Sequence, residues 1–215
     1  MPNNMPKKIQ KKVIQKKVQI KNSAKNVWLV ARKSLLTDGV VVLPVDTELY
    51  GLIALAASKP AVEKVYKIKG RDDGKPCIVL FTSWDELKQF GVMITPEIKN
   101  RLNTLWPGMV SVVLPVKPTK RSYLDRGSKT LAFRMVSKKH AKLFALLSAT
   151  GPLIAPSANP QGLPPAATLT EAKQYFGEKV DVYVAGGKRN GKPSTLIRIL
   201  ENKPIVLRQG HVKIR

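Results

Sequence analysis

Short apolar runs alternate along this chain with segments whose apolar residues recur every three or four positions, and this alternation limits the fold more than any other feature. The run VVVLPV, residues 40–45, has the composition of a buried strand, whereas the spacing of Val27, Ala31 and Leu35 just before it is helical. Because helices and strands that alternate in sequence pack as layers, the pattern predicts an α/β domain with a twisted mixed (parallel and antiparallel) sheet flanked by helices.

The same patterns indicate where each strand and helix begins and ends. Strands are expected at residues 40–45, 51–57, 76–81, 109–116, 131–136, 152–155, 180–187, 195–200 and 204–210. Helices are expected at residues 24–36, 59–70, 83–90, 95–106, 138–150 and 168–176. The chain has 215 residues and no internal repeat, so we expect a single domain over residues 23–215.

Residues 1–22 differ from the rest because lysines dominate and the few apolar residues follow no regular spacing. We expect a flexible basic arm, with two interpretations open: a frayed end, or an arm that orders on RNA. The whole chain has a net charge of +24, which favours anionic partners. No apolar run is long enough to span a bilayer and no secretory signal is present, which predicts a cytoplasmic protein without a membrane partner.

Residues that usually carry metal or nucleophilic chemistry are scarce. Cys77 opens the apolar run CIVLF and is expected to be a buried strand residue rather than a nucleophile. His140 and His211 have no partners at the spacing of a metal site or a catalytic triad. The sequence therefore predicts neither a metal site built from side chains nor histidine-based nucleophilic catalysis.

The stretch GGKRNGKPST, residues 186–195, matches the opening of the phosphate-binding motif G-x-x-x-x-G-K-[ST]. That motif needs a hydroxyl directly after its lysine and then a helix. Pro193 supplies no hydroxyl, and STLIRIL has the alternation of a strand. We therefore interpret the stretch as a glycine-rich turn between two strands.

Seven segments, in order from about residue 24 to 210, resemble motifs of the YrdC-like family, the threonylcarbamoyl-AMP synthases of tRNA modification. They are GVVVLPVDTELYGL, VYKIKGRDDGKPCIVLF, LWPGMVSVVL, KTLAFRMV, APSANPQGLPPAATLTEA, GKPSTLIRI and VLRQG. In its extent the chain resembles the short bacterial type of this family.

The resemblance implies a nucleotidyltransferase that forms L-threonylcarbamoyladenylate and pyrophosphate from L-threonine, bicarbonate and ATP. The product would serve N6-threonylcarbamoyladenosine modification of tRNA, with tRNA threonylcarbamoyl-transferase proteins as partners. ATP would be a substrate, and Mg²⁺ would be bound through its phosphates. A site for such anions requires Arg, Lys, hydroxyls and backbone N–H groups, with few carboxylates.

The resemblance also implies the residues that bind these substrates. ATP would be bound by Lys69, Arg71, Lys75, Thr130, Asn159, Thr168 and Arg208. L-threonine would be bound by Thr47, Arg134, Ser157 and Ser194. No side chain is expected to act as a nucleophile, because positioning and charge stabilisation would carry the catalysis, with Lys69 and Arg71 as candidates. The alternative for Arg134, which lies in an apolar strand, is a structural ion pair.

The chain departs from the family pattern at the turn that would border threonine. Val45 stands where the family has Thr, and one extra residue lies between Thr47 and Tyr50. An alternative function is therefore open: a protein that binds double-stranded RNA or tRNA with altered or weak catalysis. A carbamoyl-transfer module like that of hydrogenase maturation proteins is disfavoured, because zinc-finger and acylphosphatase segments are missing from this sequence.

Overall fold

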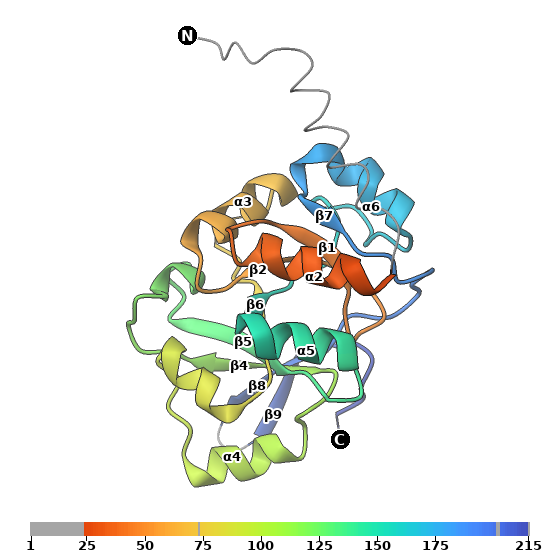
Figure 1. The fold of residues 1–215 in the computed structure, drawn as a ribbon. Helices are drawn as coiled ribbons and strands as arrows, with labels where there is room; N and C mark the ends of the chain where they lie inside the picture. Colours follow the sequence, from red (N-terminus) through yellow and green to blue (C-terminus); the bar gives the residue numbers. More distant parts are fainter. Residues whose placement is uncertain (1–23, 73, 201–202, 215) are drawn as a thin grey trace, which may run out of the picture.

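One mixed sheet organises the molecule, and the computed structural model describes residues 24–72, 74–200 and 203–214. The predicted arm at residues 1–22 lies outside the described residues. Within them, nine strands follow the spatial order β7-β1-β2-β6-β3-β5-β4-β8-β9 (Figure 1). The strands are β1 Val41–Pro44, β2 Tyr50–Leu55, β3 Ile78–Phe81, β4 Val110–Pro115, β5 Thr130–Met135, β6 Leu153–Ile154, β7 Val182–Tyr183, β8 Thr195–Leu200 and β9 Lys203–Arg208. The pairs β1–β7, β3–β5 and β4–β8 are parallel and the others antiparallel, which confirms the predicted mixed sheet.

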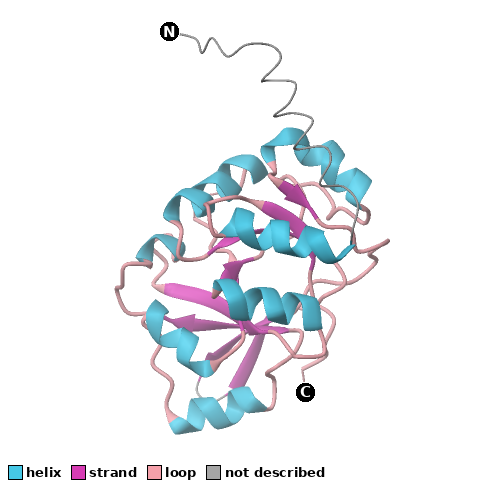
Figure 2. Ribbon diagram, in the orientation of Figure 1, coloured by secondary structure: helices cyan, strands magenta, loops and turns pink. Residues whose placement is uncertain are grey.

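Helices flank this sheet, as predicted (Figure 2). The α-helices are α2 Ala24–Leu35, α3 Lys59–Lys69, α4 Pro96–Asn103, α5 Ala141–Thr150 and α6 Leu169–Phe176, and the short 3-10 helices are η2 Trp84–Phe90, η3 Ser122–Leu124 and η4 Gly177–Lys179. Local chemistry sets the ends of α3: the Ser58 side chain accepts a hydrogen bond from the Ala61 N–H, and Gly70 adopts the left-handed conformation with φ 58°. This end positions Lys69 and Arg71 on either side of Gly70.

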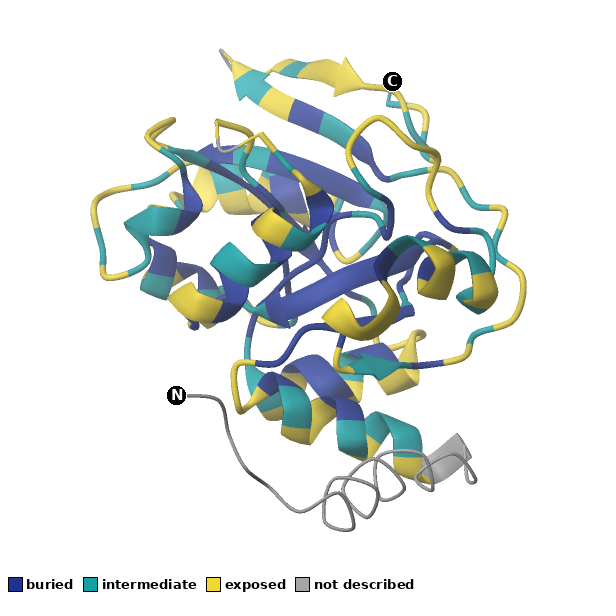
Figure 3. Ribbon diagram, turned by 90° about the horizontal axis from the view of Figure 1, so that it is seen from above, coloured by how far each residue is buried: buried dark blue, intermediate teal, exposed yellow. Residues whose placement is uncertain are grey.

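Two apolar cores occupy opposite faces of the sheet. On one face, Leu35 of α2 and Leu147 of α5 pack against Leu43 of β1. On the other face, Val65 of α3 belongs to the same core as Phe133 of β5. Figure 3 shows the central strands buried between these layers, whereas β9 at the edge is mostly exposed.

One predicted helix is confirmed in a tighter form, and one predicted strand is shorter than expected. The helix predicted at residues 83–90 is present as the 3-10 helix Trp84–Phe90, with a capping box between Ser83 and Glu86 at its start and a left-handed Gly91 (φ 71°) at its end. The strand predicted at residues 180–187 is only Val182–Tyr183, because the chain beyond it turns toward the β1–β2 connection instead of continuing beside β1.

The glycine-rich stretch connects two strands, as predicted, but these strands, β7 and β8, are not neighbours in the sheet. It belongs to a longer connection, residues 184–194, that we call the crossing segment, and it joins β7 at one edge of the sheet to β8 near the opposite edge. The Tyr50 hydroxyl accepts a hydrogen bond from the Gly186 N–H (2.9 Å) and donates one to the Gly187 carbonyl (2.8 Å). Further along, the Gly191 N–H donates to the Glu48 carbonyl at 3.1 Å. The crossing segment therefore lies against the connection between β1 and β2.

Gly191 is the tightest of these contacts. A Cβ added there would overlap the Thr47 carbonyl oxygen and the Glu48 backbone. We expect Gly191→Ala to lower the free energy of unfolding by about 1–3 kcal/mol, because backbone atoms cannot yield as a flexible side chain can. Urea denaturation measures the change. Gly74→Ala is the matched control, since the nearest atom to its added Cβ is 3.4 Å away; equal stability of the two variants would contradict the prediction.

Candidate active site

Arg134 and Asp46 form a buried ion pair at the centre of the predicted site. Since neighbouring residues of a strand point to opposite faces, and Phe133 and Met135 belong to the core beneath α3, Arg134 points to the other face of β5. Its Nη2 donates to Asp46 Oδ1 at 2.7 Å, and the side chains are only 4% and 2% exposed. Arg134 Nε is buried, and within residues 24–72, 74–200 and 203–214 it has no hydrogen-bond partner. The ion pair considered as an alternative for Arg134 is thus present, and it leaves part of the guanidinium free.

Asp46 was absent from the predicted site. The sequence feature that could have found it is an acid beside an apolar strand end, which needs a cation if it is buried. An arginine in an apolar strand, Arg134, is the complementary feature. Neither feature alone identifies the partner, because the two residues are 88 positions apart in sequence.

The turn that carries Asp46 and Thr47 accommodates the extra residue. Pro44 pairs with Tyr50 across β1 and β2, which leaves residues 45–49 as the connection. Glu48 takes a left-handed conformation with φ 57°, and the Val45 N–H donates to the Leu49 carbonyl at 2.9 Å. Thr47 is buried, and among the described residues its hydroxyl has no hydrogen-bond partner. The departure from the family pattern therefore changes the turn and keeps Thr47 inside.

Lys69, Ser157 and Asn159 form one hydrogen-bonded group. Lys69 Nζ donates to the Ser157 carbonyl (2.7 Å), the Asn159 carbonyl (2.6 Å) and Asn159 Oδ1 (2.9 Å). The Ser157 hydroxyl also donates to Asn159 Oδ1 at 2.6 Å. Burial, with a smaller contribution from the positive charge of Arg71, lowers the pKa of Lys69 to about 8. A nearby anion would favour the charged form of this lysine.

Arg71 is held in place by the chain that follows it. Its Nε donates to the Lys75 carbonyl at 2.8 Å and its Nη2 to the Pro76 carbonyl at 3.0 Å. The Lys75 side chain is largely exposed, with Nζ 3.3 Å from the Asp72 carboxylate. Asp72, where the family has proline, thus adds a weak partner for Lys75.

A second layer supports this loop. The Tyr66 hydroxyl donates to the same Lys75 carbonyl at 2.9 Å, and the Arg126 guanidinium lies 3.8 Å from the centre of the Tyr66 ring. Burial, and then the neighbouring Cys77, raises the pKa of Tyr66 to about 12, so its hydroxyl keeps the proton it donates. Tyr66 therefore positions Arg71 through a shared acceptor, which sequence patterns did not indicate.

Ser194 and Arg208 meet where β8 begins and β9 ends. Ser194 Oγ lies 2.8 Å from Ser111 Oγ, and Arg208 Nη2 donates to the Ser194 carbonyl at 2.9 Å. Burial lowers the pKa of Arg208, and the positive charges of Arg134 and then Arg71 lower it further. The charges of Arg134 and Arg71 thus act on Arg208, and that of Arg71 acts on Lys69, so we call Lys69, Arg71, Arg134 and Arg208 the cation cluster.

Thr130 and Thr168 stand apart from this cluster. The Thr130 hydroxyl lies 3.1 Å from Ser128 Oγ at the start of β5. The Thr168 hydroxyl accepts a hydrogen bond from the Glu171 N–H (3.2 Å) and caps α6. In the described part of the chain, no hydrogen bond links either threonine to the cation cluster.

The cation cluster can hold an anion with several oxygens, because it presents four positive groups and one paired carboxylate, that of Asp46. Across residues 24–72, 74–200 and 203–214, no group of three or more His, Cys, Asp or Glu side chains could hold a metal ion. No helix in these ranges is long and apolar enough to cross a membrane.

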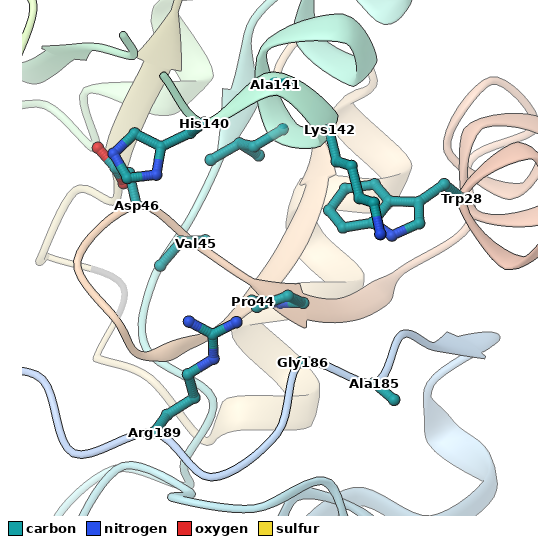
Figure 4. A pocket seen from close by; sticks show the side chains of 11 residues that line it. Trp28, Pro44, Val45, Asp46, His140, Ala141, Lys142, Ala185, Gly186 and Arg189 are labelled. Carbon is teal, nitrogen blue, oxygen red and sulfur yellow. The ribbon is translucent and has the colours of Figure 1, made fainter. Parts of the chain in front are cut away.

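Two pockets flank Asp46, and none of the predicted site residues lines either of them. The first has a volume of about 300 Å³ and is lined by Trp28, Pro44, Val45, Asp46, His140, Ala141, Lys142, Leu143, Ala185, Gly186 and Arg189 (Figure 4). The second, of about 350 Å³, is lined by Asp46, Pro107, Gly108, Met109, Ser137, Lys139 and His140. Asp46 thus lines both pockets and also pairs with Arg134 of the cation cluster.

The described part of the chain thus combines a mixed α/β sheet with two buried cations, Lys69 and Arg134, and the buried carboxylate of Asp46. Comparison with protein families identifies the family of this chain. The family model for Sua5, YciO and YrdC proteins, which is described as "Telomere recombination", matches residues 33–210. The chain belongs to this family.

Relatives and solved structures agree with this assignment. The threonylcarbamoyl-AMP synthase of Pyrococcus abyssi is 32% identical over 172 residues, which cover 80% of this chain and 50% of that protein, so the chain spans half the length of this relative. The crystal structure of P. abyssi Sua5 complexed with L-threonine has a TM-score of 0.77 and 28% identity, covering 87% of this chain and 55% of that one. E. coli YciO has a TM-score of 0.74 and 25% identity, covering 87% of this chain and 90% of that one, and therefore has a similar extent.

The ion pair between Asp46 and Arg134 gives a prediction for stability. We expect Asp46→Asn to lower the free energy of unfolding by about 3–5 kcal/mol, because it leaves the Arg134 charge buried without a counter-ion. Chemical denaturation measures this. The control is Asp85→Asn, which breaks the Asp85–Lys88 pair of nearly equal length (2.8 Å) on the exposed surface and should change nothing measurable. An Asp46→Asn variant with the wild-type free energy of unfolding would refute the structural role of the pair.

Proposed function

We propose that this chain is a threonylcarbamoyl-AMP synthase, which converts L-threonine, bicarbonate and ATP into L-threonylcarbamoyladenylate and pyrophosphate. The observation that carries the proposal is a set of cations whose charges act on one another, Lys69, Arg71, Arg134 and Arg208, of which only Arg134 is paired with a carboxylate among the described residues. Each substrate is an anion or carries a carboxylate, so such a cluster suits all three together. The names of the relatives at about 30% identity support the same chemistry.

The amino-acid end of the site is assigned to Arg134, Thr47, Ser157 and Ser194. The threonine carboxylate would take the Arg134 nitrogens that Asp46 leaves free, and the buried Nε without a partner supports this. The Thr47 hydroxyl, which lacks a partner among the described residues, is available for the threonine side chain. The hydroxyl of Ser194 lies beside that of Ser111, so this end of the site contains a pair of neighbouring hydroxyls.

The nucleotide end is assigned to Lys69, Arg71, Lys75 and Arg208, with Asn159 held by Lys69. The threonine amine would attack the bicarbonate carbon, so that an N–C bond forms and water leaves. A carbamate oxygen would then attack the ATP α-phosphorus, forming a P–O bond as the bond to pyrophosphate breaks. The cations would stabilise the charge that develops on the leaving pyrophosphate, and Mg²⁺ would bind through the phosphates.

Transfer of the threonylcarbamoyl group to tRNA would need further proteins, and the net charge of +24 supports RNA as a partner of this chain. The same charge, with the altered turn at residues 45–49, supports a second candidate function, RNA binding with weak catalysis. Turnover of the pure protein separates the two functions.

Pyrophosphate release by the pure chain tests the proposal. We expect release that requires ATP, L-threonine and bicarbonate together. Arg134→Lys should lower kcat/KM for threonine by about 100-fold, because a lysine cannot reproduce the planar fork. Arg32→Lys, an exposed change on α2, should leave it unchanged. Release that is independent of threonine would exclude this activity and favour the RNA-binding function.

The pKa of Lys69, lowered by burial to about 8, predicts a pH dependence of ATP binding. As the pH rises through 8 the ammonium loses its charge, so ATP affinity should fall by up to about tenfold at pH 9. Lys69→Arg should flatten this dependence because arginine stays charged. Lys67→Arg, an exposed change on the same helix, should follow the wild-type curve. Calorimetry with ATP between pH 7 and 9 gives the result, and a flat wild-type curve would overturn it.

A further inference from the structure

The first pocket beside Asp46 has a lining that the proposed activity does not use. It lies between α2, the end of β1, the start of α5 and the crossing segment, and Figure 4 shows side chains from all four around it. None of the residues assigned to ATP or threonine lines this pocket. A ligand of this pocket would therefore be additional to the substrates of the proposed reaction.

Arg189 is the main cation of the pocket. It extends from the crossing segment toward Pro44 and Val45 (Figure 4). Among the described residues its side chain has no hydrogen bond or ion pair, and its Nε is buried without a partner. A Cβ added at Gly186 would lie 2.8 Å from Arg189 Nη2 and 2.6 Å from Pro44 side-chain carbons, so the guanidinium packs directly over the Gly186 backbone. A held arginine without a counter-ion fits an anionic ligand.

The other charged residues of the pocket also favour an anionic ligand. Lys142 lines it from the first turn of α5, a turn that contains no acidic residue, and the N-cap residue His140 makes no side-chain capping bond. Asp46 is the single acid in the lining, and its carboxylate is already bonded to Arg134 at 2.7 Å. The anion that Arg189 requires is thus absent from the wall of the pocket itself.

An aromatic surface completes the pocket on the other side. The half-buried Trp28 of α2 lies across from Arg189 in Figure 4. Pro44, Val45 and Leu143 add apolar surface to the lining. A cationic end and a flat aromatic end, in about 300 Å³, suit a ligand with a phosphate and a planar ring. We propose that this pocket binds a nucleotide, with its phosphate at Arg189 and Lys142 and its base against Trp28.

The nucleotide could come from two sources with the same chemistry, a free mononucleotide or a nucleotide of an RNA strand. Trp28 lies five positions beyond residue 23, so the pocket is close in sequence to the lysine-rich segment. The two sources are separated by comparing AMP with 5′-phosphorylated hexa-adenylate. Tighter binding of the oligonucleotide that weakens in high salt identifies RNA, and equal binding identifies the free nucleotide.

The test titrates AMP into the full chain and follows tryptophan fluorescence. We expect quenching that is lost in Trp28→Phe, because Trp84 and Trp106 lie outside this pocket. Arg189→Ala should weaken AMP binding by at least about tenfold, the loss expected for a charge-assisted hydrogen bond. Lys188→Ala is the matched control, since Lys188 is an exposed neighbour with the same charge outside the lining, and it should bind within about twofold of wild type.

Two further results protect the test from a folding artefact. Lys142→Glu changes an exposed residue and should also weaken AMP binding by about tenfold. Arg189→Ala should keep the wild-type affinity for ATP and threonine at the proposed active site, which separates failure of this pocket from failure of the proposed function. Equal quenching in Arg189→Ala and Lys188→Ala, or adenosine binding as tightly as AMP, would overturn the proposal.

Discussion

The buried ion pair between Asp46 and Arg134 is the constraint on which the site geometry depends. It joins the turn after β1 to Arg134 near the end of β5, two parts of the sheet separated by β2, β6 and β3. Because each charge is costly to bury alone, the turn is held where the two can meet. The position of this turn determines where Thr47 lies. It also determines the path of the crossing segment, because Gly191 packs directly on the Thr47 carbonyl.

Around this pair the chain accumulates like charges that oppose folding. The lowered pKa values of Lys69 and Arg208 express that cost, because burial and neighbouring arginines destabilise their charged forms. Hydrogen bonds to carbonyl oxygens hold Lys69, Arg71 and Arg208 in place without neutralising them. An anionic ligand would supply the missing negative charge, and its binding would then stabilise this region.

The sequence predicted most of the strands and helices because apolar periodicity is local, as in residues 40–45 and 131–136. It could not predict that β7 and β8 lie near opposite edges, because the partner of β7 is β1, some 140 residues earlier. For the site, family motifs indicated the four cations that cluster, whereas Asp46 was missed because its partner is distant in sequence. Thr168 caps α6, a role that the spacing T-x-x-E of residues 168–171 displays locally.

The strand order has a consequence for how the site forms during synthesis. The cation cluster draws on residues from Lys69 to Arg208, and β8 reaches its place beside β4 only after the chain has crossed from the far edge of the sheet. A nascent chain emerging from a ribosome therefore exposes one edge of β4 until residues 195–200 have been made. The candidate site is therefore incomplete until Arg208 has been made and β9 has paired with β8.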